Sequence, residues 1–176
     1  MTEKEVVQLI QHYRHDLMNH LQVIHGYASM GKVERVEEKT SDAIAYYHEE
    51  RKLMQLQAFE FFLWVLQFHQ MYQDMRLKFR IHTENKKVEK ADKLLTEQCR
   101  QIMALVQDEN QSNDLIDIEL EMVTGRTEVI EVRLMIYGII NQESLLIRLN
   151  SLTSLYTLSV YKQANCLICD FSVPCF

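Results

Sequence analysis

The sequence predicts an α+β protein, with an N-terminal helical hairpin (residues 1–57) followed by a small α/β domain (residues 58–176). Three observations support this class. Apolar residues recur at three- and four-residue steps through the first third of the chain, which is the period of a helix with one buried face. Alternation of apolar and polar residues, typical of strands, appears in several later segments. Helical spacing returns between those segments, which indicates helices packed on a sheet.

Two apolar stripes interrupted by Gly31-Lys32 predict the hairpin. The first stripe consists of Ile10, Tyr13, Leu17, Leu21, Ile24 and Ala28, and the second of Val33, Val36, Thr40, Ala43, Tyr47 and Met54. Glycine commonly stands just beyond the end of a helix, so a tight turn should join two antiparallel helices. One hairpin cannot bury both stripes fully. We therefore expect a second copy to complete a four-helix bundle as a homodimer.

The rest of the chain alternates between the two kinds of pattern. The expected elements are a buried helix at 59–66, a strand at 77–82, a helix at 91–110, and strands at 115–123, 129–140, 155–161 and 166–171. Thr124-Gly125-Arg126 has the composition of a hairpin turn between the second and third of these strands. This order of elements predicts a small α/β sandwich.

Composition argues against several classes of protein. The formal net charge is −6, whereas nucleic-acid binding needs a concentrated basic surface. No apolar run approaches the ~20 residues that span a bilayer, and the charged N-terminus lacks the apolar core of a signal peptide. We therefore expect a cytoplasmic protein with no membrane or nucleic-acid partner and with free cysteines. Cys166-Leu-Ile-Cys169 has the spacing of half a zinc site, but no second CxxC or HxxxH pair completes it.

The first helix carries a histidine on its polar face. At ~100° per residue, His15 lies about 150° from the centre of the apolar stripe and should project into solvent. Asn19 and Gln22 fall on the same outer face, one and two turns later. Gly26 follows on that face, and its missing side chain leaves the backbone open to a partner. Together these residues form a plausible docking strip.

Phosphoryl transfer requires this kind of arrangement. Imidazole is nucleophilic near neutral pH, and in-line transfer needs an exposed acceptor on a rigid element. Arg14 would balance the charge of the phosphoryl group, and Asp16 or Asn19 would orient the ring. An exposed histidine on a helix is more often only a tolerated polar residue. The functional reading of His15 therefore depends on the whole string of neighbours.

Metal binding is a different reading of the same helix. His12, Asp16 and His20 stand four residues apart, which is a spacing that can place ligands on one helical face. His15, His20 and His25 are five residues apart, so they point to different faces and cannot share one ion. Neither set is favoured, and we expect no metal.

The string Arg14-His15-Asp16-Leu17-Met18-Asn19-His20-Leu21-Gln22-Val23-Ile24-His25-Gly26 resembles the sporulation initiation phosphotransferase B family of the bacterial phosphorelay. The same pattern also marks the dimerisation helices of some sensor histidine kinases. The string covers only the first helix, while the order of hairpin and α/β domain matches the family over nearly the full length. The family often has Trp and Lys where this chain has Leu17 and His20.

The resemblance implies a function. His15 would be the phosphoacceptor, supported by Arg14, Asp16 and Asn19, and would pass a phosphoryl group between the aspartates of two response regulators. A homodimer would dock these regulators through surface residues that include Gln22, Gly26 and His20. The chain would hold no cofactor of its own, with Mg²⁺ expected on the partner regulator. Its C-terminal domain would resemble a histidine-kinase ATPase domain that has lost nucleotide binding.

The glycine content argues against an active kinase. Kinases of this type wrap phosphates with glycine-rich segments, because only glycine lets the backbone approach so closely. This chain has Gly26, Gly31, Gly125 and Gly138 only, and neither of the last two lies in a DxGxG or GxG string. We expect no intrinsic ATP-dependent kinase activity. A non-catalytic dimeric scaffold or decoy for response regulators, or a remnant of a sensor kinase, remains the alternative.

Overall fold

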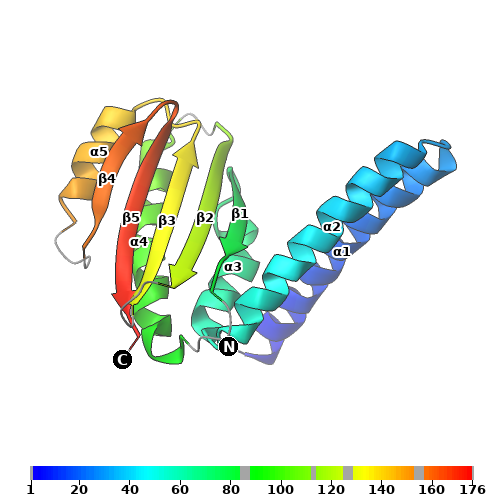
Figure 1. The fold of residues 1–176 in the computed structure, drawn as a ribbon, viewed down its shortest axis with the longest axis horizontal. Helices are drawn as coiled ribbons and strands as arrows, with labels where there is room; N and C mark the ends of the chain where they lie inside the picture. The colour runs from blue at the N-terminus through cyan, green and yellow to red at the C-terminus, as the bar shows by residue number, and fades with distance from the viewer. Residues whose placement is uncertain (1, 84–87, 112–113, 125–128, 153–156, 176) are drawn as a thin grey trace. The chain divides into compact units, whose positions relative to one another are not determined.

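The computed structural model describes residues 2–83, 88–111, 114–124, 129–152 and 157–175. It divides into two compact units, residues 1–51 and 52–176, the first helical and the second a helix-and-sheet layer structure (Figure 1). The predicted α+β class is confirmed. The boundary expected from the sequence, after residue 57, lies a few residues later than the one in the structure.

The first unit is a hairpin of α1 (Glu3–Ser29) and α2 (Val33–Gln55). The last residues of α2 belong to the second unit. Thr2 starts α1 with a capping box: its hydroxyl accepts from the Glu5 amide, and the Glu5 carboxylate accepts from the Thr2 amide. Gly31 follows the helix at φ +68°, a conformation that glycine adopts without steric cost. The predicted hairpin is thus confirmed.

The apolar stripe of α1 stays largely open within one chain. None of the residues of α1 is buried, and the side chains of Ile10 and Leu21 are 52% and 50% exposed. Leu17 and Ile24, on the side that faces α2, are half-buried. The hairpin alone therefore leaves much of its apolar surface in water, as the sequence analysis anticipated.

The second unit is built on a five-stranded mixed sheet. Its elements are α3 (Phe59–Met71), β1 (Met75–Ile81), the 3₁₀ turn η1 (Glu89–Ala91), α4 (Asp92–Glu109), β2 (Ile116–Thr124), β3 (Val129–Tyr137), α5 (Gln142–Asn150), β4 (Ser159–Gln163) and β5 (Cys166–Pro174). The strand order is β1-β2-β3-β5-β4, in which β1 and β2 are parallel and the other pairs antiparallel. A parallel pair needs a crossover, which α4 provides.

All three helices lie on one face of the sheet (Figure 1). Residues of β1 alternate between buried and exposed, so Leu77 and Phe79 face the helices. On the helical side, Trp64 of α3 and Ile102 of α4 are fully buried in the same core. The Asp92 carboxylate at the start of α4 accepts from the backbone amides of residues 60 and 61 and so caps α3.

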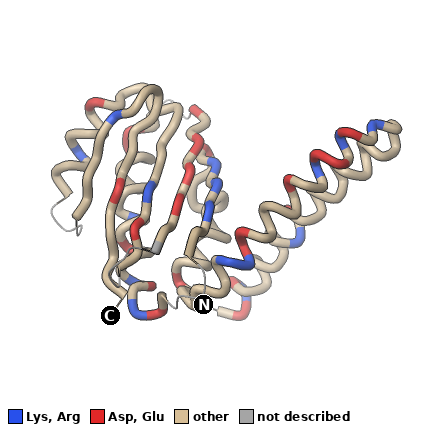
Figure 2. The backbone as a smooth tube through the Cα atoms, viewed as in Figure 1, with Lys and Arg blue, Asp and Glu red and all other residues tan. Residues whose placement is uncertain are grey.

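The opposite face of the sheet carries charged side chains. A row of bases on β1 stands beside a row of acids on β2 (Figure 2). The register pairs Arg76 with Asp117, Lys78 with Glu119 and Arg80 with Glu121. Neighbouring opposite charges of this kind keep an open sheet face soluble with little effect on stability.

Several predicted bounds differ from the observed ones. The helix predicted at 59–66 continues to Met71, and β3 ends at Tyr137 instead of residue 140, because Gly138 takes φ +91° and leaves the strand. The strand predicted at 155–161 is observed as β4, from Ser159; residues 155–156 and the predicted turn residues 125–126 lie outside the described residues. Helix α5 was not predicted at all.

Candidate functional site

His15 projects from the outer face of α1, as predicted. Its side chain is 70% exposed. The Nδ1 atom lies 3.4 Å from Oδ1 of Asp16 and 3.3 Å from Nδ2 of Asn19. The helix therefore brings three of the predicted site residues together around one ring nitrogen. Among the described residues, Nε2 of His15 has no hydrogen-bond partner and is open to solvent.

The two contacts at Nδ1 select different forms of the ring. Asp16 can only accept, so it favours the tautomer with hydrogen on Nδ1 and a free lone pair on Nε2. The Asn19 amide group donates, so it favours the opposite tautomer. When both ring nitrogens of His15 are protonated, Asp16 also balances the positive charge. The two side chains next to Nδ1 thus act in opposite directions on the tautomer of the His15 ring.

The predicted docking strip is open. Gln22 is exposed, and a Cβ atom added to Gly26 would meet no atom within 4 Å. Arg14 is also exposed, but it is rotated by ~100° from His15 round the helix, so only its long side chain can reach a group bound there.

His20 is oriented toward α2. It is half-buried, and its Nδ1 lies 3.4 Å from Oη of Tyr47. Its ring also makes edge contacts with Tyr46 and Tyr47, with centroids 5.8 and 5.9 Å away. In this orientation His20 supports the hairpin from inside.

A second polar pair joins the helices about two turns away along α1. The Tyr13 hydroxyl donates to Oε1 of Glu50 at 2.9 Å, and Glu50 is buried. Burial raises the pKa of Tyr13 to about 12, and the hydrogen bond to Glu50 adds to the effect. Burial also raises the pKa of Glu50, which the Tyr13 hydrogen bond partly offsets. This pair was not predicted from the sequence, although the tyrosines in both apolar stripes are a signal of polar contacts between the helices.

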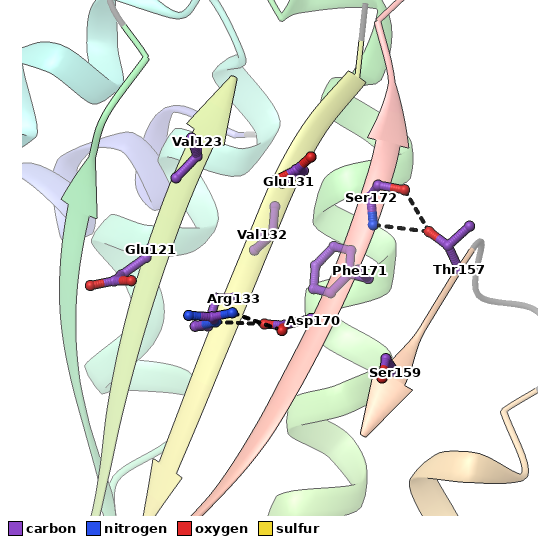
Figure 3. A pocket seen from close by; sticks show the side chains of 10 residues that line it. All are labelled: Glu121, Val123, Glu131, Val132, Arg133, Thr157, Ser159, Asp170, Phe171 and Ser172. Atoms are coloured by element: carbon purple, nitrogen blue, oxygen red, sulfur yellow. Dashed lines mark hydrogen bonds and ion pairs between the residues drawn. The ribbon is translucent and has the colours of Figure 1, made fainter. Parts of the chain in front are cut away.

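The second unit has a cavity of about 430 Å³ on the open face of its sheet (Figure 3). Arg133 on β3 donates two hydrogen bonds to Asp170 on β5, at 2.8 and 2.9 Å, and Tyr161 donates a third. Burial raises the pKa of Asp170, but the hydrogen bonds from Arg133 and Tyr161 outweigh it and leave the pKa below its ordinary value. Arg133 is the one base among the described lining residues, and Asp170 already neutralises its guanidinium. Glu121 and Glu131 add negative charge, so the described part of the lining offers no free cation to a phosphate.

A second cavity, of about 550 Å³, lies at the loop between β3 and α5. Its described lining includes one base, Lys162, and one acid, Glu143. Gly138 contributes to this loop, and a Cβ atom there would stand 3.0 Å from the carbonyl oxygen of Leu115. The glycine is therefore explained by close packing against the backbone before β2.

Neither predicted metal reading gathers ligands. Across the described ranges, no three His, Cys, Asp or Glu side chains are placed to hold one ion. His20 contacts Tyr47, whereas His12 pairs through Nδ1 with the Gln8 carbonyl at 2.9 Å. Cys166 and Cys169 are an odd number of residues apart on β5, so they face opposite sides of the sheet.

Within the described chain, no helix combines the length and apolarity needed to cross a membrane. The four cysteines are free thiols. Burial raises the pKa of Cys169 to about 12, which keeps this thiol protonated and unreactive.

Comparison with known proteins identifies the type of hairpin. Residues 1–56 match the family model of the sensor-kinase SpoOB-type α-helical domain. This segment includes His15 and both helices up to the end of α2. The sequence has no match among curated proteins. The helical hairpin, about a third of the chain, is therefore similar to the helical domain that this family model describes.

Solved structures of histidine kinases are similar at low sequence identity. The catalytic domain of histidine kinase ThkA is 17% identical with a TM-score of 0.43, covering 70% of this chain and 92% of that domain. ThkA in complex with the response regulator TrrA is 10% identical with a TM-score of 0.45, covering 96% of this chain. A blue-light activated histidine kinase of Erythrobacter litoralis is 18% identical with a TM-score of 0.40, covering 99%. The chain spans 61% of the length of each of the last two.

Proposed function

We propose that this chain is a histidine phosphotransferase of a bacterial phosphorelay. In this role His15 accepts a phosphoryl group from the aspartate of one response regulator and passes it to the aspartate of another. The observation that carries the proposal is the exposed imidazole of His15, held at Nδ1 by Asp16 and Asn19 and open at Nε2. Its position within a segment that matches a sensor-kinase helical domain supports the same reading.

The transfer is an in-line displacement. The Nε2 lone pair of His15 attacks phosphorus, the bond from phosphorus to the aspartyl oxygen breaks, and the aspartate leaves as a carboxylate. The ring keeps its hydrogen on Nδ1 and becomes positively charged, which the Asp16 carboxylate stabilises. Attack by the aspartate of the second regulator reverses these changes. No proton is gained or lost overall.

The partners follow from the surfaces of the hairpin. A second copy would cover the exposed stripe that includes Ile10 and Leu21 and form a homodimeric four-helix bundle. The regulators would dock over His15, Gln22 and Gly26, where the helix is open. Mg²⁺ for the transfer would be held by the regulator, so the chain needs no cofactor of its own.

We further propose that the phosphoryl group does not come from ATP. The first cavity presents a guanidinium already paired with Asp170, and the second offers one lysine. Gly138 packs closely against Leu115 and is not free to approach a phosphate. A triphosphate needs several cationic or amide groups turned toward it. These features support a relay fed by another protein.

The test is a transfer assay with purified receiver domains phosphorylated by acetyl phosphate. The wild-type chain should gain an acid-labile label from one receiver and lose it to a second. His15→Ala should abolish the label, while the matched variant His25→Ala, at another exposed histidine of α1, should keep it. Both substitutions lie on an exposed surface, so the free energy of unfolding should change by less than about 0.5 kcal/mol.

Two results would overturn the proposal. Label that persists in His15→Ala would assign the acceptor to another residue. A receiver that binds the dimer while no label reaches the chain would favour the scaffold reading instead.

A further inference from the structure

Two side-chain pairs tie α1 to α2 on the side of α1 that faces away from His15. Tyr13 donates to Glu50 at 2.9 Å, and His20 pairs with Tyr47 at 3.4 Å. At ~100° per residue, Tyr13 and His20 lie roughly 140–160° from His15 round the helix. Since His15 stands between Tyr13 and His20 in the sequence, the two pairs fix the helical turn that carries His15 from the opposite face of α1.

The half-buried apolar side chains between the helices give little directional control. The half-buried side chains there include Leu17, Ile24, Val36, Thr40 and Ala43. Apolar contacts depend mainly on area, so they tolerate a small rotation or slide of one helix on the other. Hydrogen bonds weaken steeply outside a narrow range of distance and angle. A few polar contacts in a helical interface can therefore fix register that the apolar contacts leave loose.

A residue of α2 also interacts electrostatically with a carboxylate next to His15. Burial raises the pKa of Tyr47, and the carboxylates of Glu50 and Asp16 raise it further. Asp16 is the carboxylate that approaches Nδ1 of His15. Tyr47 of α2 therefore lies within electrostatic range of the carboxylate that approaches Nδ1 of His15.

We propose that Tyr13–Glu50 and His20–Tyr47 are positioning pairs for phosphoryl transfer at His15. They set the rotation and height of α1 on α2, and with them the direction in which Nε2 of His15 faces a docked regulator. The inference rests on the proposed function, because it concerns the geometry of that transfer. In-line transfer is sensitive to such geometry, since a misplacement of ~1 Å can cost about a hundredfold in rate.

The test removes one hydroxyl at a time. Tyr13→Phe and Tyr47→Phe each break one tie. Tyr27→Phe is the matched control, because Tyr27 is a half-buried tyrosine of α1 whose hydroxyl makes no hydrogen bond within the described residues. With a phosphorylated receiver domain as donor, kcat/KM for labelling should fall about tenfold in the first two variants and stay unchanged in the control. Glu50→Gln keeps an acceptor for Tyr13 and should retain the wild-type rate.

A small donor separates positioning from chemistry. Phosphoramidate labels an exposed imidazole without docking, so all four variants should react with it at the wild-type rate. Circular dichroism should show unchanged helix content in all four variants. If Tyr13→Phe has less helix than the wild type, the comparison of Tyr47→Phe with the Tyr27→Phe control still tests the inference.

Four results would overturn the inference. If Tyr13→Phe and Tyr47→Phe are both labelled by the receiver at the wild-type rate, the inference is wrong and the proposed function is unaffected. Equal losses in the Tyr27 control, or parallel losses with phosphoramidate, would indicate general loosening instead of positioning. A wild-type chain that no receiver labels at His15 would remove the proposed function, and this inference with it.

Discussion

Glu50 is a carboxyl group inside the hairpin with only one oxygen satisfied. Its Oε1 accepts from Tyr13, while Oε2 has no partner among the described residues. Burial raises the pKa of this carboxyl above its ordinary value of 4.5. The folded state therefore binds a proton at pH values where the unfolded chain has already released it. By linkage, the free energy of unfolding falls as pH rises through that interval.

Glu50→Gln should remove this pH dependence. Below pH 4.5 the wild-type Glu50 is protonated in both states, so the two proteins should then be similar in stability. As pH rises above this value, the wild type should lose free energy of unfolding relative to the variant, until the raised pKa is passed. Denaturant titrations at a series of pH values measure the difference.

Glu37→Gln is the control, because Glu37 is an exposed acid on the same helix. The free energy of unfolding of this variant, plotted against pH, should run parallel to that of the wild type. A Glu50→Gln curve that also runs parallel would show that Glu50 is not desolvated in the folded protein.

The sequence could predict the exposure of His15 but not the orientation of His20. His15 lies far from the apolar stripe by angle alone, and the structure confirms its exposure. His20 was assigned to the docking surface by resemblance, yet it stands three residues after Leu17 and four before Ile24, both in the stripe. That spacing indicates the inner face. Its partner Tyr47 comes from α2, however, and a contact between two helices depends on their register, which one sequence does not fix.

At the scale of elements, α1 presents an apolar face that one chain cannot cover. Leu21 is 50% exposed, so a charge there costs little in an isolated hairpin. In the proposed dimer the same position lies in the bundle core, where an unpaired charge is strongly unfavourable. Leu21→Asp should therefore convert a dimer into a monomer with little loss of helix content. Sedimentation equilibrium measures the change in mass.

Gln22→Asp supplies the matched control. It introduces the same charge one residue later, on the exposed outer face of α1. This variant should remain dimeric. A Leu21→Asp protein with unchanged mass, or a wild-type protein that is monomeric at micromolar concentration, would contradict the predicted bundle.

The long helices and strands have a strong apolar periodicity, which made them predictable. Helix α5 has a weak one and was therefore not predicted. That helix has nine residues, and its buried positions are Leu145 and Leu149 only. Asn141 precedes it without a side-chain cap, and the run Leu145-Leu146-Ile147 does not alternate. Packing against α4 and β4 selects the helix, so the local sequence contains little signal for it. The strand order was likewise beyond periodicity, because alternation says nothing about which strands pair.

At the scale of the whole molecule, the chain combines a hairpin that presents His15 with a sheet domain whose cavities offer few cations. A nucleotide bound at a hundredfold its dissociation constant would stabilise its domain by about 2.7 kcal/mol. We expect no such stabilisation with Mg-ATP. The two larger described cavities show one guanidinium engaged by Asp170 and one lysine, Lys162, whereas a triphosphate needs several donors that face it together. A third cavity, lined by Lys78 and Arg80, has a volume of only about 50 Å³.

Thermal unfolding of the second unit with and without Mg-ATP tests this expectation. The variant Gly138→Ala is the positive control, which shows that the assay detects a change in the stability of this unit. Gly138 has φ +91°, and an added Cβ would stand 3.0 Å from the Leu115 carbonyl oxygen. The substitution should therefore lower the free energy of unfolding by about 1–3 kcal/mol and shift the transition by several degrees. Mg-ATP should shift neither protein, and His15 should stay unlabelled when ATP is the only donor. Saturable stabilisation by Mg-ATP together with label on His15 would make the chain a kinase, because the phosphoryl group would then come from nucleotide bound to the chain itself.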